Sequence, residues 1–138
     1  MVAITDAASD AAAAIQLAGT IIIKIGSSLL VEDAHDALNA AWLAGVAGDI
    51  AMLHEAGKNV VVVSSGAIAL GRRELGIDNR ELALEEKQAA AATGQVTLAH
   101  AWREALAAHG IGVAQILLSP EDTETRRRHL NARATMGA

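Results

Sequence analysis

Two short runs of β-branched residues constrain the fold of this 138-residue chain most strongly. Residues 20–25 read TIIIKI and lie between two glycines. Residues 60–63 are four consecutive valines, followed directly by the sequence Ser-Ser-Gly. Runs this short and this uniformly apolar are typical of parallel strands that are buried on both faces. We therefore expect two such strands.

Helical patterns separate and follow these runs. Apolar residues with helical spacing predict amphipathic helices over 38–53 and 84–109, and a short helix is expected over 67–75, with Gly76 at its end. Within the longest segment, Gly94 lowers the helix propensity, but it can allow a neighbouring helix to approach closely. Trp42 and Trp102 fall on the apolar sides of their helices, so we expect both to pack in the core.

The last part of the chain predicts one more strand and one more helix. Residues 111–118 are the strand candidate. Ser119-Pro120-Glu121-Asp122 then supplies an N-cap serine, a proline at the first helical position and an acid at the third, so a helix should run toward Thr135. Strands that alternate with helices predict the α/β class, with right-handed parallel crossovers and a sheet covered on both faces.

Composition and charge exclude several classes of protein. Apolar residues make up 52% and charged residues 20% of the chain, and the mean hydropathy is +0.30, which argues against disorder. The net charge of −5 provides no global positive field for nucleic acid or anionic lipid, so we expect neither as a partner. The basic run 126–129 is therefore interpreted as a solvated or paired helix face.

The cysteine count and the amino terminus bear on location. The chain has no cysteine, which excludes disulfides and thiolate chemistry and favours the cytoplasm. The alanine-rich start lacks a basic n-region and carries Asp6 and Asp10, so we interpret residues 1–19 as a poorly ordered extension or frayed helix rather than a signal peptide. The longest uncharged stretch, 105–120, is too short to span a membrane.

The two strand ends are the best candidates for a binding site. Ligands of parallel sheets bind beyond the carboxyl ends of the strands, where helix N-termini attract anions. Lys24 lies near the end of the first strand, Gly26 and Ser27 follow it, and Ser65 and Gly66 follow the second strand, which together suggest a phosphate or carboxylate site. The alternatives are that the glycines only serve strand-to-helix turns, and that the lysine, a cation in an apolar strand, snorkels to water.

Familiar phosphate and metal motifs are absent from the sequence. There is no G-x-x-x-x-G-K-[ST] pattern, and Gly110-Ile111-Gly112 follows a helix instead of a strand, which disfavours Walker NTPases and Rossmann dehydrogenases. The histidines show no ligand spacing, so we expect no protein metal site. They are His35, His54, His100, His109 and His129.

Four longer blocks resemble a known family. The sequences IIIKIGSSLL, NVVVVSSGAIALGRRELG, LEEKQAAAATGQ and LNARAT resemble the amino-terminal half of the glutamate 5-kinases, which belong to the amino acid kinase family. The resemblance covers residues 20–135, and other amino acid kinases share only the looser K-x-G-S/T pattern. It implies a three-layer α/β/α sandwich with a mainly parallel sheet, of which residues 20–138 form the substrate- and phosphate-side half.

The resemblance also implies an activity. Glutamate 5-kinases use ATP, with Mg²⁺, to phosphorylate the side-chain carboxylate of glutamate to glutamyl 5-phosphate in the first step of proline biosynthesis. By resemblance, Lys24 touches the transferring phosphoryl group, and the amides of Gly26 and Ser27 cradle the phosphates. Ser65 and Gly66 then bind glutamate.

The chain also departs from the family pattern. The nucleotide-binding half and a second lysine of the family have no counterpart here, so we expect a truncated domain, negligible activity from this chain alone, and self-association through an exposed sheet edge. Two alternatives stay open: a non-catalytic remnant that binds an anion or pairs with a partner, and an amino acid kinase acting on another carboxylate, carbamate or phosphate.

Overall fold

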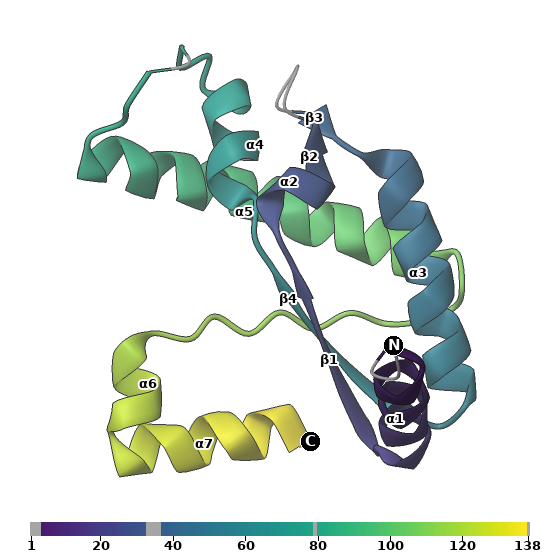
Figure 1. Ribbon diagram of the computed structural model, residues 1–138. Coiled ribbons are helices and arrows are strands. Elements are labelled where there is room, and N and C mark those ends of the chain that lie inside the picture. Colours follow the sequence, from purple (N-terminus) through teal and green to yellow (C-terminus); the bar gives the residue numbers. More distant parts are fainter. Residues whose placement is uncertain (1–3, 33–36, 79, 138) are drawn as a thin grey trace.

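A computed structural model describes residues 4–32, 37–78 and 80–137 (Figure 1). The elements in chain order are α1 (Ile4–Leu17), β1 (Thr20–Ile25), α2 (Ser27–Leu30), β2 (Val31–Glu32), β3 (Ala37–Leu38), α3 (Ala40–Glu55), β4 (Asn59–Ser64), α4 (Ala67–Glu74), α5 (Leu84–Ala107), α6 (Pro120–Glu124) and α7 (Arg126–Gly137). The α/β class predicted from the alternating pattern is confirmed.

The two predicted strands pair with each other. β1 and β4 are parallel, with their residues in register from Thr20 opposite Asn59 to Ile25 opposite Ser64. Just beyond the ladder, the amide of Ser65 donates to the carbonyl oxygen of Ile25 at 3.0 Å. Both strands therefore end at the same edge, and the small residues that follow them meet there, as parallel pairing requires.

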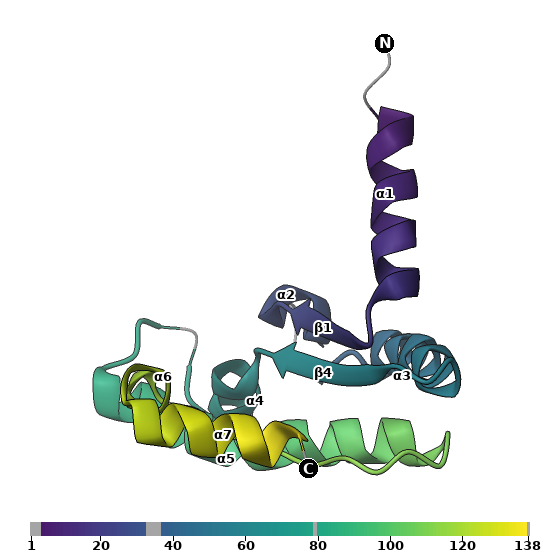
Figure 2. The same ribbon diagram turned by 90° about the horizontal axis from the view of Figure 1, so that it is seen from below.

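Burial alternates along β1, and the residues of β4 are half-buried or exposed, so the expectation that the two strands are buried on both faces is wrong for the described residues. Ile25 is 2% exposed and belongs to the core, whereas Ile22 is 69% and Val63 is 49% exposed on the opposite face. The helices α3 and α5 pack on one face of the sheet (Figures 1 and 2). A strand is buried on both faces only where helices cover both faces of its sheet. The described residues supply helices on one face only.

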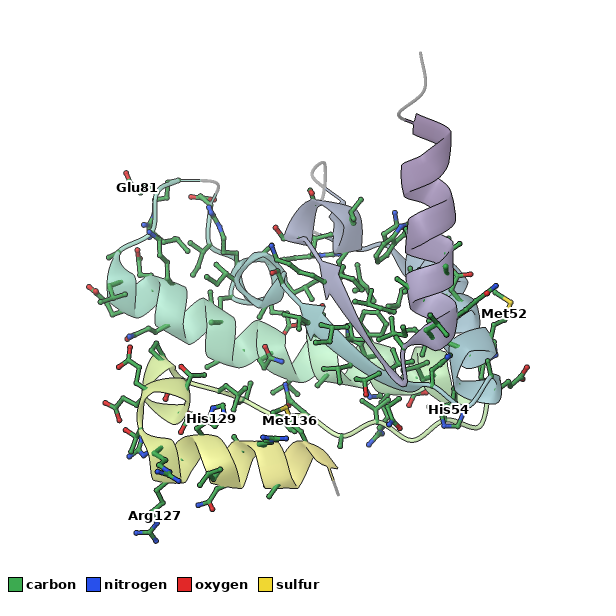
Figure 3. The ribbon with its side chains drawn as sticks, turned by 60° about the horizontal axis from the view of Figure 1, so that its bottom comes forward. Met52, His54, Glu81, Arg127, His129 and Met136 are labelled. Carbon is green, nitrogen blue, oxygen red and sulfur yellow. The ribbon has the colours of Figure 1, made fainter. Side chains whose placement is uncertain are left out.

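The core lies between the sheet and these helices. A stripe at every fourth position of α5 is buried, comprising Ala90, Gly94, Leu98, Trp102 and Leu106. Leu43, Ala47 and Ile50 of α3 face it, and Trp42 packs against the same cluster, so the predicted core role of both tryptophans is confirmed. Met52, on the outer side of α3, projects into solvent (Figure 3).

Helices α4 and α5 cross with their backbones in contact. A Cβ atom built on Gly71 would lie 2.6 Å from the carbonyl carbon of Ala90 and 2.9 Å from the amide nitrogen of Gly94. A Cβ atom on Gly94 would lie 3.0 Å from the carbonyl carbon of Ala67. The prediction that Gly94 permits a close helix approach is confirmed. Its partner glycine was not predicted.

The segment 111–118 differs from its prediction. It forms no strand ladder and runs as an extended, largely exposed segment past the sheet, although it is as apolar as a strand should be (Figure 1). Apolar composition favours burial but does not supply a hydrogen-bonding partner. In the described part of the chain, the only neighbour that β4 has in its sheet is β1.

The C-terminal helix begins as predicted but is interrupted. The amide of Ser119 donates to the Asp122 carboxylate at 2.7 Å, which is the expected cap interaction. Thr125 then adopts an extended conformation and separates α6 from α7. Arg128 forms an ion pair with Glu121 at 2.8 Å across the break, in agreement with a paired helix face for this arginine.

The amino-terminal extension forms α1, which stands away from the rest of the chain (Figure 2). The ammonium group of Lys58 donates to the carbonyl oxygen of Gln16 at 2.6 Å and links the helix end to the start of β4. No helix among the described residues combines the length and the apolar character needed to cross a bilayer.

Candidate functional site

An open cavity lies at the carboxyl ends of β1 and β4. Its volume is about 530 Å³. It is lined by Ser27, Ser64, Ser65, Gly66, Ala67, Ile68, Ala69 and Arg72. Apart from Ile68 and Arg72, these side chains are small, so the backbone forms much of the wall. The cavity lies where ligands of open parallel sheets usually bind.

Gly66 makes the turn from β4 into α4. Its φ angle of +114° is one that residues with a side chain rarely adopt. A Cβ atom there would also lie 3.3 Å from Cγ2 of Val31 and 3.4 Å from Cδ2 of Leu30. The backbone conformation therefore favours glycine at this position, and a larger residue would also press on these two side chains.

The N-terminus of α4 forms one side of the cavity. Gly66 is its N-cap residue, and no side chain caps the helix there. The amide of Leu70 is the first to donate within the helix, to the carbonyl oxygen of Gly66 at 3.1 Å. The amides that precede it belong to the positive end of the helix dipole, which favours an anionic ligand.

The structure brings three of the five predicted site residues to the cavity wall. Ser27, the first residue of α2, lies there together with Ser65 and Gly66. Gly26 and Lys24 are not among the lining residues. Gly26 is the N-cap residue of α2 with a φ of −76°, a conformation open to any residue, so its backbone shows no need for glycine.

Lys24 lies on the exposed face of β1, opposite Val63 of β4. The expectation that this strand is buried on both faces, which would make a cation there costly, is wrong, because alternation along the strand turns this side chain away from the core. Burial therefore provides no argument for a bound anion at this ammonium group. The side chain reaches water, and its contact with a phosphoryl group stays a prediction.

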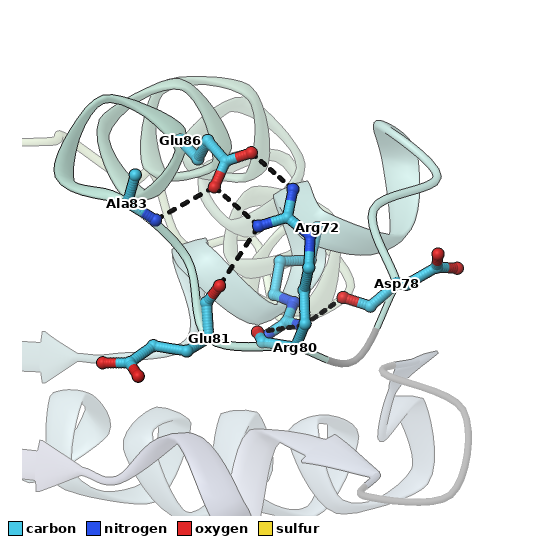
Figure 4. Close-up of polar contacts among 6 residues, drawn as sticks. All are labelled: Arg72, Asp78, Arg80, Glu81, Ala83 and Glu86. Carbon is cyan, nitrogen blue, oxygen red and sulfur yellow. Dashed lines mark hydrogen bonds and ion pairs between the residues drawn. The ribbon is translucent and has the colours of Figure 1, made fainter.

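Arg72 lies in the block NVVVVSSGAIALGRRELG, which resembles the family, but it was not predicted as a site residue. It is the one lining residue with a formal charge. Its Nη2 atom donates to the carbonyl oxygens of Asp78 at 2.5 Å and Arg80 at 3.0 Å (Figure 4). The guanidinium group thus ties the loop after α4 to the helix, a contact that no local sequence signal reveals.

The same loop is held to α5 by an ion pair. The Arg80 guanidinium donates to both carboxylate oxygens of Glu86, at 2.5 and 2.8 Å (Figure 4). Glu86 also accepts the amide of Ala83 at 2.9 Å. The bonds from Arg80 and from the Ala83 amide lower the pKa of Glu86 to about 2.

Ser64 connects the cavity wall to the core. Its Oγ atom accepts the indole N–H of Trp102 at 3.2 Å and donates to the carbonyl oxygen of Ser65 at 3.3 Å. Sequence reasoning placed Trp102 in the core but missed this contact, because 38 residues separate the two side chains.

Metal-binding side chains do not gather in the described part of the chain. No group of three or more histidine, aspartate or glutamate side chains there could hold an ion. His35 lies outside the described residues.

Comparison with known proteins gives a consistent assignment. The model of the family described as "Amino acid kinase family" matches residues 19–137. "Glutamate 5-kinase" of Rhodopseudomonas palustris (strain TIE-1) is 57% identical over 116 residues, which are 84% of this chain and 31% of that protein.

Two further relatives carry the same name. "Glutamate 5-kinase" of Caulobacter vibrioides (strain NA1000 / CB15N) is 59% identical over 122 residues, covering 88% of this chain and 32% of the relative. "Glutamate 5-kinase" of Ruegeria sp. (strain TM1040) is 54% identical over 124 residues, which are 90% of this chain and 34% of that protein. The chain thus spans about a third of the length of these curated relatives.

Proposed function

Because the chain belongs to the amino acid kinase family, we propose that it serves the transfer of a phosphoryl group from ATP to the side-chain carboxylate of glutamate. The observation that carries this proposal is the cavity where Ser27, Ser65 and Gly66 meet beside the N-terminus of α4. The name shared by the relatives supports glutamate as the acceptor.

The chemistry suits a site without an acid or a base. A glutamate carboxylate has an ordinary pKa of about 4.3, so it is ionised at pH 7 and attacks phosphorus without losing a proton. The new bond joins a carboxylate oxygen to the γ-phosphorus, and the bond from that phosphorus to the bridging oxygen of ADP breaks. The products are an acyl phosphate and ADP, and the protein has only to position the reactants and to offset their negative charge.

The residues divide this work by their place in the fold. We assign the glutamate to Ser65 and Gly66, and the phosphates to the backbone amides of Gly26 and Ser27. Lys24, whose ammonium group is free to move on the exposed face of β1, approaches the transferring phosphoryl group. The described carboxylates provide no set that fits Mg²⁺.

A second function class is favoured by a specific observation. The outer face of the sheet exposes Ile22 and Val63, and residues 116–118 are exposed as well. Exposed apolar surface marks interaction sites, so a non-catalytic chain that pairs with a partner explains these residues directly. We propose that the 138 residues alone turn over negligibly, since they correspond to about a third of their relatives.

A chimera tests the function. This chain would replace the 122 matched residues of the Caulobacter relative, and acyl phosphate formed from ATP and glutamate would be trapped with hydroxylamine. We expect an active chimera that Lys24→Ala slows by about 10²-fold or more, because one lost electrostatic donor typically has that effect. Lys87→Ala, an equivalent change of a lysine on α5, should leave the rate unchanged.

The outcomes separate the two classes. A folded chimera that forms no acyl phosphate would refute the kinase proposal and leave the pairing function. Turnover by the isolated 138-residue chain, abolished by Lys24→Ala, would refute the proposal that these residues are inactive alone.

A further inference from the structure

We infer that Trp102 is a positioning residue which, through Ser64, sets the direction of the Ser65–Gly66 peptide in the cavity wall. Trp102 does not line the cavity. It is 6% exposed and lies in the buried stripe of α5 between Leu98 and Leu106. Its indole ring therefore has little freedom to move, and its N–H group is a fixed donor at the end of β4.

The donors and acceptors allow one arrangement of this contact. An indole N–H can only donate, so Ser64 Oγ must accept at the 3.2 Å contact. The hydroxyl proton of Ser64 is then free for the carbonyl oxygen of Ser65, 3.3 Å away. The indole N–H of Trp102 thus fixes the position of Ser64 Oγ, and the Ser64 hydroxyl in turn fixes the carbonyl group of Ser65.

The peptide that follows is fixed on both sides. The amide of Ser65 donates to the carbonyl oxygen of Ile25 at 3.0 Å. The Ser65–Gly66 peptide is trans, so the N–H of Gly66 points opposite to the carbonyl of Ser65. Holding that carbonyl therefore sets the direction of the Gly66 amide.

Gly66 makes such a restraint necessary. A glycine has no Cβ atom to limit its backbone angles, so the peptide in front of it can rotate more easily than others. The hydrogen bonds from Ser64 and to Ile25 restrict this rotation. A merely structural tryptophan would fill the core without affecting the two amides.

Amide hydrogen exchange of the 138-residue chain, followed by NMR, tests the link. Trp102→Phe keeps an aromatic ring in the core and removes the donor, and Ser64→Ala removes the bridging hydroxyl. We expect both changes to raise the exchange rate of the Ser65 amide, which donates to the carbonyl oxygen of Ile25, about two- to tenfold relative to that of Val61, the range for the loss of one hydrogen bond. Ser64→Thr retains a hydroxyl group, so the exchange rate in this variant should stay close to that of the wild type.

Two further measurements keep the inference testable even if one of these variants does not fold. In the wild-type chain, the indole proton of Trp102 should exchange more slowly than that of Trp42, which is less buried. Trp42→Phe, the matched control, should leave exchange at Ser65 unchanged. Exchange at this amide that is equal in wild type and Trp102→Phe, or a fast-exchanging Trp102 indole in wild type, would overturn the inference.

Glutamate titration of the same variants measures the consequence, and this part rests on the proposed function. We expect Trp102→Phe to weaken glutamate binding by a factor similar to its effect on exchange. If the wild-type chain binds no glutamate, the assignment of glutamate to Ser65 and Gly66 in this chain fails. The exchange rates still decide whether Trp102 positions the peptide.

Discussion

Gly71 and Gly94 face each other where α4 crosses α5, and a Cβ atom on Gly71 would lie 2.9 Å from the amide nitrogen of Gly94. The contact is reciprocal, because a Cβ atom on Gly94 would overlap the backbone of Gly71 and Ala67. Two glycines therefore allow two helix backbones to touch. This crossing places the cavity-lining start of α4 against the long helix that carries Trp102.

Gly71→Ala and Gly94→Ala should each destabilise the chain by about 1–3 kcal/mol or more, because the obstructing atoms are backbone and cannot rotate away. Urea unfolding followed by tryptophan fluorescence measures the change. Gly45→Ala in α3 is the matched control, since a Cβ atom there would meet nothing within 4 Å and alanine is the better helix former. It should stabilise the chain by about 0.5–1 kcal/mol. Equal effects at Gly45 and Gly71 would contradict the close crossing.

Gly66→Ala should cost about 1–3 kcal/mol of stability, because alanine must adopt a φ near +114° and its Cβ atom would press on Val31. The same urea titration provides the measurement. Gly112→Ala has open space and no positive φ, so its unfolding midpoint should stay close to that of the wild type. A neutral Gly66→Ala would show that the turn adopts another conformation.

Leu98→Ala should destabilise the chain by about 2–5 kcal/mol, because it leaves a cavity in the core where this side chain is 2% exposed. Val96→Ala, two residues earlier on the same helix, should have little effect, since that side chain is 72% exposed. Thermal unfolding of the pair, followed by circular dichroism, tests which face of α5 packs inward. A larger loss of stability from Val96→Ala than from Leu98→Ala would contradict the packing of α5 described above.

Glu86 should make stability depend on acid pH. Its pKa of about 2 lies below the ordinary value of 4.5, so its ionised form stabilises the folded chain above about pH 4.5, and this contribution is lost as the pH falls toward 2. Glu86→Gln should therefore flatten the change in urea midpoint between these pH values. Glu85→Gln, at the neighbouring position, should leave the slope as in the wild type. An unchanged slope in Glu86→Gln would rule out the ion pair with Arg80 as its source.

Local patterns predicted most of the elements. The period of the apolar residues located α3, α4 and α5 to within a few residues, because amphipathic spacing is a property of one segment. The same approach missed the short hairpin of β2 and β3 and the Asn39 cap of α3, whose side chain accepts the amide of Trp42 at 3.0 Å.

The candidate site was predicted in part, and for a physical reason. Small residues after two strands identified Ser27, Ser65 and Gly66, since parallel strands bring their carboxyl ends to one edge. The strand that carries Lys24 was expected to be buried on both faces, but the exposure of a strand residue depends on whether a second layer covers its face. Arg72 was overlooked because its partners, the carbonyl oxygens of a later loop, carry no sequence signal.

By itself, then, the sequence determined the three longer helices of the core and the two paired strands, where the small residues follow these strands, and which family the blocks resemble. These properties depend on neighbours within a few positions along the chain. Tertiary structure alone decided that Gly71 meets Gly94, that Trp102 reaches Ser64, and that residues 111–118 stay unpaired. Such contacts join positions far apart in sequence, and their formation depends on how whole elements pack against each other.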